Sequence, residues 1–446
     1  MSQDREHGLQ RQLSAGQVAM VAVGGSIGTG LLLGAGASVR LAGPAVIVSY
    51  VIGAILAYTV TAAMGEMASL HPAAGSFGLY AELYLNRWAS FVSRAAYWYS
   101  VVIAVGAELI AIATYARYWF PAVPGWIWVI VFAAVLLGIN LFSVGEYGAT
   151  EYWLAMIKVA AITLFIVIGS VLLAGGRVAA QYTSTGFVPN GWRSMLMALP
   201  FTLFSFLGIE MVAISSGEAR SARDVARATR IMFALLAFVY LGAITVLVGV
   251  MPWQQAGIAE SPFVTVFRLA GLPAASTIVN VIVLTAAFSG ANANIYVASR
   301  MMFSLSRDGY APAALGKLNH RGAPVRALLA STFGILLAVW LERTVPESAF
   351  LYFLGSSLFG GMLAWWVALS AHVAFRRKLS ADVLAGLPFR APGGAWPSIL
   401  GFAGILAAMI GTWWVPDLRI CLVSGIPALA ILTVLYWIVE RGRTST

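Results

Sequence analysis

Cysteine, histidine and charged side chains are scarce in this chain. Its 446 residues include a single cysteine, Cys421, which excludes a disulfide bond within the chain. Charged residues make up 10% of the sequence, whereas soluble domains carry about 25%. Because 60% of the residues are hydrophobic and the mean hydropathy is +0.86, the composition predicts a protein that crosses a membrane several times.

The long apolar stretches also lack the residue clusters of enzymes and metal sites. Catalysis inside a membrane needs a nucleophile beside a base, or a group of metal ligands. No stretch carries paired His or Asp residues, so we expect no enzyme, no catalytic residue, no metal and no cofactor. The absence of a Walker motif argues against an ATP-driven pump. All four histidines fall at or near loops that we expect to be cytoplasmic: His7, His71, His320 and His372.

Apolar runs of about 20 residues predict twelve transmembrane helices. The connecting segments are too short to form soluble domains, so a single membrane domain is expected to fill residues 1–446. The polar start has no short apolar core followed by a cleavage site, so we expect the first apolar run to stay in the protein. The predicted spans are 18–42, 45–69, 88–119, 126–143, 152–174, 194–216, 229–251, 273–305, 325–341, 348–375, 396–414 and 420–439.

The distribution of Lys and Arg predicts that both termini are cytoplasmic. With that orientation, nineteen of the 27 basic residues lie in inner segments, seven lie in outer segments, and Lys158 lies within a span. The net charge of +10 therefore follows from topology and from attraction to anionic membrane lipids. It does not indicate a nucleic-acid partner, which would require one continuous basic face.

Two of the predicted spans contain features that interrupt a helix. The stretch "AVGGSIGTGLLLGAG", residues 22–36, contains six glycines, and glycine weakens a helix interior by about 1 kcal/mol relative to alanine. In "FTLFSFLGIEMVAISSGEA", residues 201–219, Gly208 stands beside Glu210 near the middle of the membrane. These two spans are five apart, which is the spacing that two inverted repeats of five helices produce.

A broken helix offers binding groups of both signs. The amide N–H groups at the start of the second half attract a carboxylate, and the carbonyls that end the first half attract an ammonium. One interrupted helix can therefore hold both ends of an amino acid. Close packing of helices against Gly24 and Gly28, or against Gly30 and Gly34, is the alternative explanation for the glycines in the first span.

These motifs resemble a known transporter family. Together with "EYWLAMIKVAAITLFIVIG" and "YVASRMMFSLSRDGYAPAALGKLNHRGAPV", they are similar over residues 9–375 to the bacterial amino acid transporter branch of the amino acid-polyamine-organocation superfamily. The resemblance implies an all-α, 5+5 inverted-repeat fold in the bacterial inner membrane, with broken helices 1 and 6. Its repeats would span 18–174 and 194–375, and two further helices would lie within 396–439.

The resemblance also implies secondary active import of an amino acid by alternating access, commonly by symport with protons. Exchange of an amino acid for a product stays open as the alternative, and oligomeric state is not predicted. A pocket framed by Phe204, Phe206, Ser26 and Ser205 favours a small or medium neutral amino acid. The acidic residues Glu210 and Glu218 do not discriminate among substrates.

Carried over by position, the resemblance assigns the substrate-binding residues. The substrate carboxylate would meet the backbone of Ser26, Ile27, Gly28, Thr29 and Gly30. The ammonium would meet carbonyls near Val23 and at Phe204, Ser205 and Leu207, beside the second break at Gly208. Phe204 would also close over the substrate from outside, unless it is bulk that faces lipid.

Ionisable residues within the spans need a partner or a role, since a charge there costs at least about 2.5 kcal/mol. Lys158 either snorkels to the inner interface or takes the place that sodium occupies in sodium-coupled relatives of this fold, between spans 1 and 8, beside Ser289. Glu108 either meets the substrate ammonium and the first break, or makes a plain interhelical hydrogen bond. We expect Glu210 to cap the freed amides of the inner half of span 6, and Glu66 to pair with loop arginines.

Overall fold

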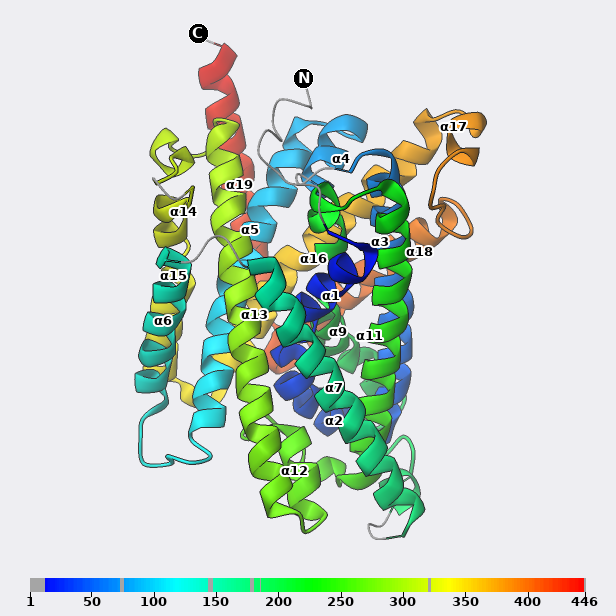
Figure 1. The fold of residues 1–446 in the computed structure, drawn as a ribbon, viewed down its shortest axis with the longest axis vertical. Coiled ribbons are helices and arrows are strands. Elements are labelled where there is room, and N and C mark those ends of the chain that lie inside the picture. Colours follow the sequence, from blue (N-terminus) through cyan, green and yellow to red (C-terminus); the bar gives the residue numbers. More distant parts are fainter. Residues whose placement is uncertain are drawn as a thin grey trace.

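The protein is a bundle of helices, many of which run along its long axis (Figure 1). In the part of the chain that the structure describes, β structure is limited to one isolated bridge between Leu13 and Ala219. Residues 1–12 of the polar start, which include His7, and also His320, lie outside the described residues. This computed structural model describes residues 13–72, 76–142, 147–176, 180–184, 186–319 and 322–444.

The helices follow the predicted apolar runs, with short helices between them. They are α1 (Ala15–Ser26), the π-helical turn η2 (Gly30–Gly34), α2 (Ala35–Ala42), α3 (Val46–Leu70), α4 (Ser76–Tyr84), α5 (Arg87–Ala116), α6 (Gly125–Phe142), α7 (Tyr147–Ala174), α8 (Gln181–Ser184), α9 (Arg193–Phe206), α10 (Met211–Ile214), α11 (Ala222–Val250), α12 (Pro262–Leu269), α13 (Pro273–Arg307), α14 (Val325–Ala330), α15 (Phe333–Thr344), α16 (Pro346–Lys378), α17 (Ala381–Ala385), α18 (Trp396–Gly411) and α19 (Ile420–Thr444).

The predicted count of twelve spans is not confirmed. Ten helical segments among the described residues are long and apolar enough to cross a membrane, and one of them, Gly30–Leu70, combines the second half of span 1 with span 2. Two shorter apolar helices, Ala15–Ser26 and Gly125–Leu141, accompany them. The first is 12 residues long, about 18 Å at helical rise, and cannot cross a hydrocarbon core of about 30 Å by itself.

Local sequence fixes where several helices begin. Ser14 and Gln17 form a capping box at the start of α1, in which the Gln17 N–H donates to Ser14 Oγ at 3.4 Å. The Ala89 N–H donates to Asn86 Oδ1 at 2.8 Å and caps α5. Pro346 occupies the first position of α16. A backbone N–H at this position would have no partner within the helix, so the missing N–H of proline costs no hydrogen bond. Each cap starts a helix close to the start of a predicted span.

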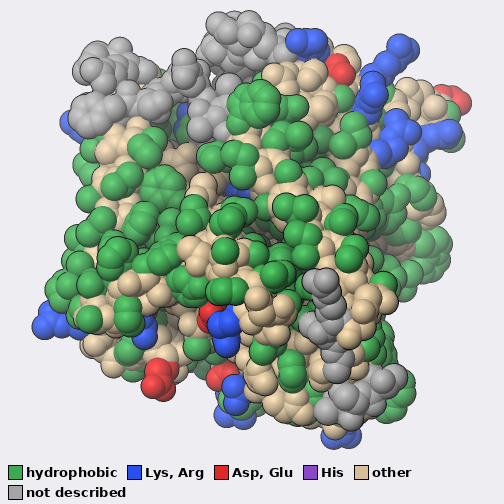
Figure 2. Space-filling model, turned by 60° about the horizontal axis from the view of Figure 1, so that its bottom comes forward, with side chains coloured by type: hydrophobic (Ala, Val, Ile, Leu, Met, Phe, Trp, Pro, Cys, Tyr) green, Lys and Arg blue, Asp and Glu red, His purple; other side chains and the backbone are tan. Residues whose placement is uncertain are grey.

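The loops separate to two opposite ends of the bundle. Helices α4 and α17 and the last turns of α19 lie at the upper end of Figure 1, and α12 lies at the lower end. Hydrophobic side chains cover most of the face in Figure 2, and charged side chains gather near its upper and lower margins. Large side chains such as Leu400 and Leu336 are about two-thirds exposed. So much exposed apolar surface fits a bilayer rather than water.

The two interrupted spans lie at the centre of the bundle. Helix α1 packs against α7, α11 and α13, and η2 and α2 pack against α9. Helix α5 contacts both α13 and α16 and forms another wall of the same central region. Figure 1 places α1 and α9 near the middle of the view, surrounded by the longer helices. The fold therefore brings the two breaks together.

Candidate functional site

The first span breaks directly after α1. Its helical backbone ends at Ser26, and Ile27 has φ −80° and ψ 90°, outside the helical region. The Gly28 N–H turns back to Ser26 O at 3.1 Å, and the chain resumes as η2 at Gly30. The break predicted from the glycine-rich stretch is therefore present, over residues 27–29.

The sixth span breaks between α9 and α10. Leu207 leaves the helix with ψ 137°, and Gly208 has φ 108°, a conformation that favours glycine. A Cβ atom on Gly208 would lie 2.6 Å from the carbonyl oxygen of Gly25. Glycine at 208 is thus required by backbone conformation and by the close approach of the first break.

The two breaks meet backbone to backbone and border a cavity of about 40 Å³. A Cβ atom on Gly30 would lie 2.7 Å from Ser205 Cα, so η2 and α9 touch at their ends. Helices α5, α13 and α16 complete the wall. The cavity is lined by Gly25, Ser26, Gly28, Gly30, Tyr97, Ser100, Val101, Ala104, Glu108, Phe204, Leu207, Gly208, Glu210, Met211, Asn294 and Ser357.

The predicted binding residues divide between this wall and the layer behind it. Seven of them line the cavity: Ser26, Gly28, Gly30, Glu108, Phe204, Leu207 and Gly208. Six do not: Val23, Ile27, Thr29, Lys158, Ser205 and Ser289. Phe204 is only 8% exposed, which excludes the alternative that it faces lipid. Its role as an outer gate stays a prediction.

Several backbone carbonyls predicted to hold the ammonium already accept hydrogen bonds. Val23 O accepts from the Ile27 N–H at 2.9 Å, and Phe204 O accepts from the Leu207 N–H at 3.1 Å. A carbonyl oxygen has two lone pairs, so each can still accept a second donor. The assignment of the ammonium to these carbonyls therefore stays a prediction.

Two buried tyrosines support the breaks, and the sequence analysis missed both. The hydroxyl of Tyr240 on α11 donates to Ser26 O at 2.6 Å. The hydroxyl of Tyr50 on α3 lies 3.1 Å from Ser205 Oγ. Aromatic residues are common in spans and carry no distinct spacing here, so no pattern could have separated these two from ordinary core residues.

Glu108 lies against the first break from α5. Its side chain is 6% exposed, and Oε1 accepts from the Thr29 N–H at 3.3 Å. Within the described residues, Glu108 Oε2 and Thr29 Oγ1 have no hydrogen-bond partner. Two glycines leave room for this carboxylate. A Cβ atom would lie 2.5 Å from Glu108 Oε1 if added to Gly28, and 2.9 Å from it if added to Gly290. Because a buried oxygen without a partner is costly, Glu108 Oε2 can accept a hydrogen bond from a donor that enters the cavity.

Glu210 supports the second break, but it binds an amide of the break itself rather than capping the first amides of α10, the inner half-helix, as predicted. Its Oε1 accepts from the Gly208 N–H at 3.1 Å, and its Oε2 accepts from Trp365 Nε1 on α16 at 2.9 Å. A carboxylate that accepts two N–H groups is well satisfied when buried. Glu210 therefore ties the freed amide of the break to α16.

Lys158 points inward rather than toward the membrane interface. It is 3% exposed, and its Nζ donates to Gly24 O at 2.7 Å, which contradicts the snorkelling alternative. Ser289 is reached indirectly: its Oγ donates to both carboxylate oxygens of Glu151, whose Oε1 lies 3.8 Å from Lys158 Nζ. Lys158 thus ties α7 to the last turn of α1, just before the first break.

The sequence analysis missed Glu151 because the predicted span 5 began at residue 152. In the structure α7 begins five residues earlier, at Tyr147, so Glu151 lies in its second turn and is 1% exposed. Its spacing of seven from Lys158 places both residues on one face of a helix. That spacing was the available signal. Among the described residues, no group of three or more His, Cys, Asp or Glu could hold a metal ion.

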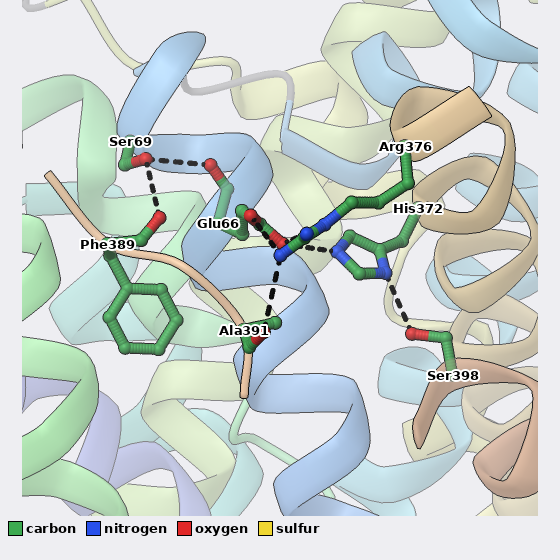
Figure 3. A network of polar contacts seen from close by, with 7 residues as sticks. All are labelled: Glu66, Ser69, His372, Arg376, Phe389, Ala391 and Ser398. Carbon is green, nitrogen blue, oxygen red and sulfur yellow. Dashed lines mark hydrogen bonds and ion pairs between the residues drawn. The ribbon is translucent and has the colours of Figure 1, made fainter. Parts of the chain in front are cut away.

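A second buried network lies around Glu66 on α3, as Figure 3 shows. Arg376 donates from Nε to Glu66 Oε2 at 2.9 Å and from Nη2 to Oε1 at 2.5 Å. His372 Nε2 lies 2.6 Å from Glu66 Oε2, and its Nδ1 lies 2.8 Å from Ser398 Oγ. Arg376 also donates to Ala391 O at 3.2 Å. The network joins α3, α16 and α18, and its arginine belongs to the last turn of α16 rather than to a loop.

We expect Glu66→Gln to lower the melting temperature of the purified protein by at least about 5 °C. Removing one partner of a buried ion pair costs about 3–5 kcal/mol, because the other charge is left uncompensated. The measurement is thermal unfolding in detergent. Glu347→Gln, at the exposed start of the same helix α16, is the matched control and should change little. An unchanged melting temperature for Glu66→Gln would contradict this account of the network.

Comparison with known proteins agrees with the geometry. Residues 17–441 match the model of the amino acid permease family. "Uncharacterized amino acid permease YtnA" of Bacillus subtilis (strain 168) is 32% identical over 444 residues, which cover 98% of this chain and 96% of that relative. "Probable threonine/serine transporter YbxG" of the same organism is 34% identical over 445 residues, with the same coverage. "Aromatic amino acid transport protein AroP" of Escherichia coli (strain K12) is 35% identical over 424 residues, 92% of this chain and 93% of the relative. The chain therefore belongs to the amino acid permease family, as its motifs predicted, and is a multi-pass membrane protein.

Proposed function

We propose that this protein is a secondary transporter that imports an amino acid together with protons by alternating access, and that it is not an enzyme. The observation that carries the proposal is the meeting of two broken helices around a cavity with the unpartnered Glu108 Oε2 in its wall. Irregular backbone at this depth is tolerated where protein or a water-filled cavity surrounds it, and such breaks typically form transporter binding sites. The membrane is the bacterial plasma membrane, with both termini cytoplasmic.

In this proposal the substrate binds across the first break. Its carboxylate meets the backbone from Ser26 to Gly30, where the positive end of the η2–α2 helix dipole begins. Its ammonium meets Glu108 Oε2, directly or through water, and the carbonyls of Val23, Phe204, Ser205 and Leu207. Phe204 closes the cavity from outside. Residues 18–174 and 194–375 form the two repeats that rock against each other.

Proton coupling is assigned to Lys158 in this proposal. Its ammonium donates to Gly24 O at 2.7 Å on α1, and in this proposal it takes the place of a coupling cation between α1 and α13. When Lys158 is protonated it holds α7 against the first break, and when it is neutral that tie weakens. A single charge can bias a two-state element in this way. Ser289 belongs to the same site through Glu151.

The substrate is proposed to be a neutral amino acid of small or medium size. Ser26, Leu207 and Phe204, which are uncharged, line the cavity. The relative YbxG is named as a probable threonine/serine transporter and AroP as an aromatic amino acid transport protein, and these amino acids are also neutral.

Uptake into proteoliposomes tests the proposed function. A thermal-shift screen of the purified protein against amino acids selects the labelled substrate, because a specific ligand stabilises the folded state. Empty vesicles with an inward proton gradient are then expected to accumulate substrate, and collapse of the gradient should stop accumulation. Uptake only into vesicles preloaded with amino acid would instead establish the alternative, exchange. Uptake that requires neither a proton gradient nor preloaded amino acid would contradict both symport and exchange.

A further inference from the structure

Glu151 is a second buried charge at the contact between α7 and α1. Its side chain is 1% exposed, and both carboxylate oxygens accept the hydroxyl of Ser289 on α13, at 3.0 and 3.1 Å. Two helical turns further along α7, Lys158 Nζ lies 3.8 Å from Glu151 Oε1 and 2.7 Å from Gly24 O on α1. A continuous polar chain therefore runs from α13 through both side chains of α7 to α1.

A glycine on α1 leaves room for the carboxylate of Glu151. A Cβ atom on Gly24 would lie 2.6 Å from Glu151 Oε1 and 3.0 Å from the Cβ of Ala155. No real Cβ comes that close to an oxygen without displacing it, so glycine at 24 lets α7 approach. The same residue supplies the carbonyl that receives the lysine. Gly24 thus serves the contact with α7 as well as the glycine-rich break.

The charges around Lys158 come from two helices. Glu151 faces it from α7, and Glu108 acts on it electrostatically from α5. Helices α1 and α13 contribute the uncharged Gly24 carbonyl and Ser289 hydroxyl to the same chain. A buried ammonium is stable only when it is paired and hydrogen-bonded. Glu151, which accepts from the Ser289 hydroxyl, is the carboxylate that lies 3.8 Å from the ammonium.

We propose that Glu151 is the positioning residue for Lys158: it holds the protonated ammonium against the Gly24 carbonyl and joins the lysine to α13 through Ser289. The proposal rests on the proposed coupling role of Lys158. In the protonated state the pair is neutral overall and closes α7 onto α1. When the lysine is neutral, the buried carboxylate of Glu151 has no compensating charge. This favours separation of α7 from α1 and entry of water.

Replacing Glu151 by Gln tests this role, because Gln keeps the shape and the bond to Ser289 but loses the charge. We expect Glu151→Gln to reduce proton-driven accumulation at least about fivefold, the equivalent of roughly 1 kcal/mol. Substrate exchange between two loaded compartments, which needs no net proton movement, should stay within about twofold of the wild type. Glu151→Asp keeps the charge and should recover part of the accumulation. Glu342→Gln, a buried carboxylate of α15 away from the cavity, is the matched control and should accumulate normally.

The outcomes separate this inference from the proposed function. Normal accumulation by Glu151→Gln, with accumulation lost in Lys158→Ala, would overturn the role of Glu151 and leave proton coupling intact. Normal accumulation by both variants would overturn the coupling role of Lys158 itself. If Glu151→Gln is poorly folded, the double variant Glu151→Gln/Lys158→Met should regain stability, because no unpaired charge is then buried. Failure of the double variant to regain it would show that Glu151 serves only the scaffold, and would also overturn the proposal.

Discussion

Glu108→Gln is expected to lower uptake at least about tenfold while leaving expression and melting temperature nearly unchanged. The Gln carbonyl can still accept from the Thr29 N–H, which Glu108 Oε1 accepts at 3.3 Å. What the variant loses is the charge on the oxygen that has no partner among the described residues. A hydrogen bond to a charged group contributes about 1.5–3 kcal/mol, and 1.4 kcal/mol corresponds to a tenfold change in affinity.

Initial uptake rates over a range of substrate concentrations measure this effect, together with thermal unfolding of the same preparation. Glu342→Gln serves as control, because it makes the same chemical change in a buried carboxylate that does not line the cavity. Normal uptake by Glu108→Gln would reduce Glu108 to a residue that packs α5 against the break. A fall in stability that matches the fall in uptake would lead to the same conclusion.

Hydropathy predicted where the helices lie but not where the backbone departs from them. Every predicted apolar run overlaps a helix, since burial in lipid requires both apolar side chains and complete backbone hydrogen bonding. The predicted span 325–341 is divided into α14 and α15 at Ser331, which no glycine or proline marks. The short helices α4 and α12, of nine and eight residues, were not predicted, because each is far shorter than an apolar run of about 20 residues.

The breaks were predictable because glycine leaves a direct conformational signal. Gly208 adopts φ 108° and lies against Gly25, so its residue type follows from its backbone. The partners of the breaks were less accessible, because contacts such as Tyr240 to Ser26 join residues 214 positions apart. Glu151 alone had a recognisable pattern, its spacing of seven from Lys158, but the predicted span began at residue 152 and so excluded it.

Lys158→Ala is expected to abolish accumulation driven by a pH gradient while substrate binding survives. The ammonium is the group that joins α7 to the Gly24 carbonyl at 2.7 Å, and alanine can neither carry a proton nor reach that oxygen. The lysine does not line the cavity, so the contacts proposed for the substrate stay in place. Uptake by the wild type should also be the same in sodium-free buffer as in sodium-containing buffer, because the ammonium takes the place of a coupling cation.

Uptake into proteoliposomes with an imposed gradient measures the first effect, and ligand-induced thermal stabilisation measures binding. Alanine leaves Glu151 buried without its ammonium, so Lys158→Ala/Glu151→Gln is the matched control, in which neither charge is buried. If stability returns in the double variant but accumulation does not, the missing function is proton coupling rather than folding. Sodium-dependent uptake by the wild type, or full accumulation by Lys158→Ala, would contradict the role of Lys158 and leave it as a structural tie between α7 and α1.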